Sequence, residues 1–146
     1  MCKFTDFTLI IRLVSNKKRY KRTIHTYLLQ FYRYSLFTGD LEYEFGQDAL
    51  SVKADWYSDM TLTYDKIDSI EYWEGNVSGT RVGGFSSFRL LMGFFRNEEF
   101  GTYTRYTYHR PEACVILTAG DRTIVLSGVD AAETGYLYQQ LQEKCS

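Results

Sequence analysis

Apolar and polar residues alternate along much of the chain from Gly39 onward, with the period of two that is typical of β-strands. Leu41, Tyr43 and Phe45 alternate with acidic residues, which predicts a strand with one face in water. The first four such segments arrive every 8–10 residues, a spacing that favours a β-barrel or a sandwich. The pattern predicts strands at 41–45, 50–54, 60–64, 67–73, 102–108, 113–118 and 123–127.

Glycine marks the middle of this region. Residues 74–79 are the clearest loop, and the glycine-containing segment 81–88 is expected to continue it. Residues 89–96 are apolar and fit a further strand with a bend or bulge at Gly93.

The last element is predicted to be a helix. Asp130 is the expected N-cap, and Glu133 stands three residues later, as in a capping box. Thr134, Leu137 and Leu141 then fall on one face, which we expect to cover one open end of the β structure.

Residues 1–38 differ from the rest and are predicted to be a basic N-terminal extension. Apolar positions from Ile24 to Tyr32 recur at helical spacing and suggest an amphipathic helix after a short strand. Three interpretations stay open: the apolar face packs on the following domain, it lies on an anionic membrane surface, or the segment is a disordered leader from an over-long gene start.

The distribution of charge also separates the N-terminal extension from the rest of the chain. The 146 residues carry 17 basic and 18 acidic side chains, so the net charge is only −1. Residues 1–34 hold eight basic side chains and one acid, which leaves 9 basic and 17 acidic side chains after them. A basic arm before an acidic body points to an anionic partner or to attraction between arm and body.

Ordered motifs from Gly39 to Ser146 resemble a family of bacterial pleckstrin-homology-like (PH-like) domains. A strand is followed by Ile67 and Ile70 in an I-x-x-I pattern. Then come the motifs Arg81-Val82-Gly83-Gly84, Met92-Gly93-Phe94-Phe95 and Phe100-Gly101-Thr102-Tyr103. The resemblance implies a mainly-β barrel of about seven antiparallel strands capped by one C-terminal helix. It implies a binding role and no common catalytic activity.

No catalytic or metal-binding group emerges from the residues. His25 and His109 neighbour no recognisable nucleophile motif, and the cysteines and histidines lack metal-ligand spacing. We therefore predict a protein that is not an enzyme and needs no cofactor. Cys2, Cys114 and Cys145 are widely spaced and odd in number, which favours free thiols and a cytoplasmic location.

Protein or peptide binding, or self-association, fits the sequence best, because one edge strand of such a barrel can accept an extended peptide. The predicted contact region is glycine-rich and aromatic, and comprises Trp73, Arg81, Gly83, Gly84, Phe85 and Phe88.

The alternative is peripheral binding to an anionic membrane or a phosphate ligand, through the basic arm and arginines at the barrel rim. The arm would contribute Lys17, Lys18, Arg19, Lys21 and Arg22. Nucleic-acid binding ranks lower, since the acidic body opposes it.

Overall fold

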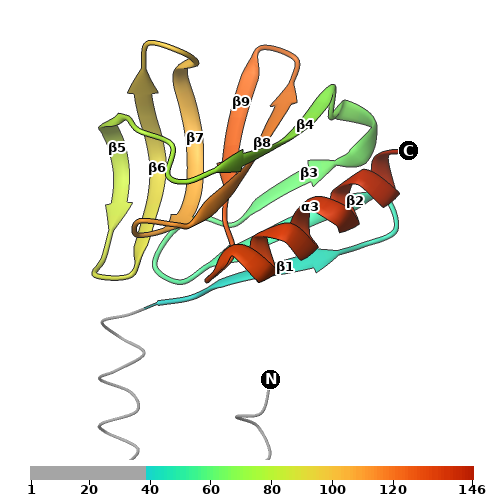
Figure 1. Cartoon of the computed structure of the whole chain (residues 1–146), viewed down its shortest axis with the longest axis horizontal. Coiled ribbons are helices and arrows are strands. Elements are labelled where there is room, and N and C mark those ends of the chain that lie inside the picture. Colours follow the sequence, from blue (N-terminus) through green and yellow to red (C-terminus); the bar gives the residue numbers. More distant parts are fainter. Residues whose placement is uncertain (1–38) are drawn as a thin grey trace, which may run out of the picture. The chain divides into compact units, whose positions relative to one another are not determined.

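The computed structural model describes residues 39–146, which form two β-sheets and one helix (Figure 1). The small sheet has the order β1-β2-β3 and is antiparallel throughout. Its strands are β1 (Leu41–Phe45), β2 (Ala49–Ala54) and β3 (Met60–Thr63), and a 3-10 turn, η1 (Tyr64–Lys66), follows. Alternation of buried and exposed side chains along β1 and β2 explains why the sequence predicted them.

The large sheet has six strands in the order β4-β8-β9-β7-β6-β5. They are β4 (Ser69–Glu74), β5 (Thr80–Ser86), β6 (Leu90–Asn97), β7 (Gly101–Tyr108), β8 (Ala113–Ala119) and β9 (Arg122–Leu126). Neighbours pair antiparallel except β7 and β9, which run parallel. The connection from β4 to β5 therefore has to pass from one outer strand to the other (Figure 1).

Helix α3 (Ala131–Cys145) begins as predicted. The Asp130 carboxylate accepts a hydrogen bond from the Glu133 backbone N–H, and the Glu133 carboxylate accepts one from Val129 N–H. The buried face of the helix carries Thr134, Leu137 and Leu141, and packs against β4, β8 and η1.

The predicted fold class is confirmed: the described chain is mainly β, with one C-terminal helix. Two details differ from the prediction. Nine strands are present in residues 39–146 where about seven antiparallel ones were expected, and the β7–β9 pair is parallel. Segment 81–88, expected as loop, contains most of β5, because pairing with β6 stabilises an extended conformation that glycine does not favour by itself.

The main core lies between the two sheets and the helix. It joins Leu50 and Val52 of the small sheet to Leu117 and Leu126 of the large sheet and to Leu141 of the helix. A second cluster lies on the opposite face of the large sheet, since its members alternate along the strands with those of the main core. It comprises Val77, Phe95, Tyr103, Cys114, Ile116 and Val125.

Candidate functional site

Four of the six predicted contact residues lie on one outer strand. Arg81, Gly83, Gly84 and Phe85 belong to β5, and Phe88 lies at the tip of the hairpin that joins β5 to β6. In the described part of the chain β5 pairs with β6 alone and ends the order of the large sheet. Its outward side therefore presents backbone N–H and C=O groups that have no strand partner in residues 39–146.

The two glycines of this strand differ in role. Gly84 has φ +123° and faces Gly93 of β6, which has φ +120°. A Cβ built on Gly84 would lie 2.6 Å from the Gly93 Cα, which is too close for any side chain. Gly83 has no atom within 4 Å of such a Cβ and no left-handed φ. Close packing of the two strands accounts for Gly84, while nothing in the described structure demands glycine at position 83.

Apolar side chains are exposed along the β5–β6 hairpin. Val82 is 65% exposed, Phe94 is 51% exposed and Phe88 is 92% exposed. The strand pairing shifts register between Arg81 and Gly83, so Val82 lies in a β-bulge. Phe85 behaves differently, because it is half-buried against the main core. The hairpin thus combines one anchoring aromatic residue with three exposed apolar ones.

An open hollow of about 570 Å³ lies at the hairpin tip, lined by Ser86, Ser87, Phe88, His109 and Arg110. The Ser87 hydroxyl accepts hydrogen bonds from the backbone N–H groups of Arg89 and Leu90, and so shapes the turn. His109 N–H donates to the Arg89 carbonyl, which ties the β7–β8 loop to the tip. A histidine and an arginine side chain therefore border the hollow beside an exposed phenyl ring.

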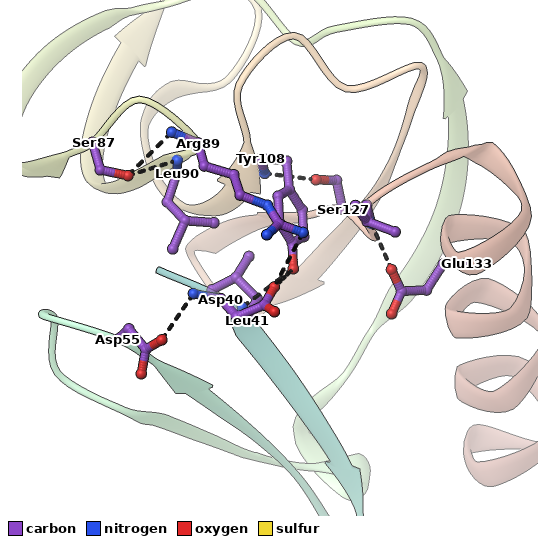
Figure 2. A network of polar contacts seen from close by, with 10 residues as sticks. Asp40, Leu41, Asp55, Ser87, Arg89, Leu90, Tyr108, Ser127 and Glu133 are labelled. Carbon is purple, nitrogen blue, oxygen red and sulfur yellow. Dashed lines mark hydrogen bonds and ion pairs between the residues drawn. The ribbon is translucent and has the colours of Figure 1, made fainter. Parts of the chain in front are cut away.

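A polar network fixes the base of this tip (Figure 2). The Tyr108 hydroxyl bonds to the Asp40 carboxylate and accepts from Leu41 N–H, and Arg89 stacks over the Tyr108 ring at 5.1 Å. The Arg89 guanidinium lies 3.7 Å from the same carboxylate. Burial, followed by the hydrogen bond to Asp40, raises the pKa of Tyr108 well above its usual range. The hydroxyl therefore stays protonated and links the start of β1 to the end of β7, where Arg89 of the hairpin tip also contacts the Tyr108 ring.

The structure does not bring Trp73 to the other predicted residues. Trp73 lies on β4, the opposite outer strand of the large sheet, and is half-buried. It packs edge-to-face on Phe100, with ring centroids 6.4 Å apart, as part of the second cluster. Its position is that of a packing residue for this outer face.

The sequence reasoning missed Arg105, which is only 2% exposed. Its guanidinium donates to the Val77 carbonyl, the Asn76 side chain and the Thr107 hydroxyl, each at 2.6 Å, and it lies 5.3 Å from the centre of the Phe95 ring. No carboxylate of residues 39–146 forms an ion pair with it. Arg105 thus fastens the β4–β5 connection to the large sheet and positions the chain where β5 begins.

The predicted anion contacts Lys17, Lys18, Arg19, Lys21 and Arg22 lie outside the described residues. Within residues 39–146, no group of three or more His, Cys, Asp and Glu side chains is placed to hold a metal ion. No helix in this same range is long and apolar enough to cross a bilayer.

Two sheets and one C-terminal helix fit a PH-like domain, a class whose members are in general non-catalytic binding modules. Residues 41–142 match the family model described as bacterial PH domain. The chain therefore belongs to the bacterial PH domain family, as the ordered motifs of its sequence suggested. Searches of curated proteins and of solved structures gave no significant match.

Proposed function

We propose that this domain is a non-catalytic protein-binding module that takes up an extended segment of a partner protein as an additional strand beside β5. The position of β5 at the outer end of the large sheet carries this proposal. An extended peptide laid along such a strand gains main-chain hydrogen bonds, while side-chain contacts provide selectivity.

The surroundings of β5 support uptake of a peptide that contains apolar side chains. Val82 and Phe94 are both more than half exposed on this hairpin. Burial of exposed apolar area contributes about 25 cal/mol per Å², so these side chains would stabilise a peptide beyond its backbone bonds. The other outer strand, β4, offers less open surface, because α3 packs against it.

Hydrogen exchange tests this proposal directly. Peptides selected from a random library for binding to the full chain are added, and amide exchange is followed residue by residue. We expect slower exchange at the outward amides of Thr80–Ser86, because an added strand gives them acceptors. Protection elsewhere, with β5 unchanged, would refute strand addition.

A matched pair of variants separates the site from general surface effects. Val82→Asp places a charge on the outer strand and should weaken peptide binding. Val129→Asp places the same charge on another valine that is more than half exposed (51%), just before α3, and should not weaken binding. Equal affinities for the two variants would contradict the proposal. Cytoplasmic location, and contact with an anionic membrane through the N-terminal extension, remain predictions from the sequence.

A further inference from the structure

Cationic side chains gather at both ends of β5, although the domain is acidic. Residues 39–146 hold 9 basic and 17 acidic side chains. At the beginning of β5, Arg81 is exposed and Thr80 pairs with Arg96 of β6. At its other end, Ser86 borders the hollow that is also lined by His109 and Arg110. The strand thus runs from one positively charged position to another.

These cations are not neutralised by the domain itself. The ion pairs among the described residues join Lys53 to Glu44 and Arg89 to Asp40. Arg81, Arg96 and Arg110 form none within residues 39–146, even though carboxylates outnumber basic groups there. An unpaired arginine is well suited to a carboxylate, since its planar guanidinium can bind both oxygens.

From these positions we infer that the partner segment is an acidic–apolar–acidic peptide, with carboxylates at both ends of an apolar stretch. This inference rests on the proposed function and specifies the partner. Arg81 and Ser86 are five residues apart, which corresponds to about 17 Å in an extended strand. One carboxylate meets Arg81, the other meets Arg110 of the β7–β8 loop beside the hairpin tip, and the apolar side chains between them contact Val82, Phe94 and Phe88.

The same charges oppose pairing of β5 with a second copy of the chain. A two-fold antiparallel pair centred on Gly83 would place the Arg81 end of one copy beside the Ser86 end of the other. Arg81 of each copy would then lie near the Arg110 end of the other copy. Like charges placed opposite each other across strands are destabilising, so the occupant is a different, acidic chain.

The test compares peptides of about eight residues, blocked at both termini, with alternating Val and Thr between two Asp residues or two Asn residues. Affinity is measured by calorimetry with the full chain, and exchange at Thr80–Ser86 reports the site. We expect the Asp peptide to bind about tenfold more tightly at low salt, with the difference shrinking as salt is added.

Arginine variants complete the experiment. Arg81→Gln and Arg110→Gln should each weaken binding of the Asp peptide several-fold and leave the Asn peptide unaffected. Arg122→Gln is the control, since Arg122 is an exposed arginine at the start of β9, in the interior of the sheet order.

Equal binding of both peptides, with β5 protected, would overturn the acidic specificity and leave strand addition standing. If neither peptide binds and the peptides selected from the library protect amides outside β5, both the acidic specificity and strand addition at β5 are refuted. A dimer of the free chain with protected β5 amides would overturn the choice of an acidic partner over a second copy.

Discussion

The pair Gly83 and Gly84 provides a sharp test of how the outer strand is built. Replacing Gly84 by alanine forces a side chain onto a residue with φ +123°, at 2.6 Å from the Gly93 Cα. Replacing Gly83 by alanine adds the same methyl group where no atom lies within 4 Å. The two variants change composition identically and differ by one position in the same strand.

The magnitude follows from two costs at Gly84. A non-glycine residue in a sparsely populated backbone region costs about 1–3 kcal/mol. Crowding a packed position with an extra methyl group costs about 1–3 kcal/mol more, because β5 must move away from β6. Gly84→Ala should therefore lose about 3 kcal/mol of unfolding free energy, whereas Gly83→Ala should stay within about 0.5 kcal/mol of the parent chain.

Thermal unfolding of the full chain measures the difference. For a domain of this size, about 3 kcal/mol corresponds to a midpoint lower by roughly 10 °C. Equal midpoints for Gly83→Ala and Gly84→Ala would refute the close approach of β5 to β6. Gly93→Ala supplies a second check, because a Cβ there would lie 2.5 Å from the Gly84 Cα. Once one substitution has separated the strands, adding the other should cost less than it does alone.

Three further predictions concern buried polar groups. Arg105→Leu should lower the free energy of unfolding, measured in urea, by about 2 kcal/mol, because the buried Val77 carbonyl loses its hydrogen-bond donor. Amide exchange at Gly75–Gly79 should become faster for the same reason. The control variant Arg122→Leu should change neither the unfolding free energy nor the exchange rates. Tyr108→Phe should lower the free energy of unfolding in urea by about 1 kcal/mol, because the hydrogen bonds of the Tyr108 hydroxyl with Asp40 and Leu41 are lost. Because the pKa of Tyr108 is raised, its native state holds the proton more tightly. The contribution of Tyr108 to stability should therefore be constant below about pH 10 and fall above it, so that stability declines more steeply in the parent than in Tyr108→Phe above that pH. Burial raises the pKa of the Cys114 thiol and shields it from reagents. Iodoacetamide should therefore modify Cys114 more slowly in the native chain than in urea, as measured by mass spectrometry. Equal rates of modification would contradict the burial of Cys114.

The strands and helix that the sequence predicted are those whose signal is local. β1 and β2 bury every second side chain, and this produces the alternation directly. The Asp130 cap is likewise a contact across three residues. β5 was missed because Gly83 and Gly84 weaken a strand pattern and its extended form depends on β6. The parallel pairing of β7 with β9 could not be inferred either, because strand order is decided by contacts between distant segments.

The residues of the candidate site also differ in how far the sequence indicated them. Glycine, arginine and phenylalanine in segment 81–88 led to its choice as the predicted contact region, although the segment was expected to be loop and most of it lies in β5. Trp73 was grouped with them by closeness in sequence, yet the β4–β5 connection carries the chain to the opposite edge of the sheet. Arg105 sits in a Thr- and Tyr-rich strand, and its contacts with Asn76 and Val77 of that connection depend on how distant segments meet, which the sequence does not show.

The bulge and the charged side chains of β5 oppose its pairing with a second copy, and the same features can favour one kind of partner. Outer strands are hazards in solution, and proteins protect them with bulges and charged side chains. β5 carries both protections, the bulge at Val82 and the exposed charge of Arg81. The bulge and the charge leave the outward backbone groups of β5 free to form hydrogen bonds. They require, however, that a pairing strand carry negative charge, and a second copy of this cationic edge does not. The acidic extended segment that we propose meets this condition, because its carboxylates reverse the sign of the end contacts. In the function that we propose, the local placement of a few arginines, against a net negative charge, therefore decides which chain pairs with β5.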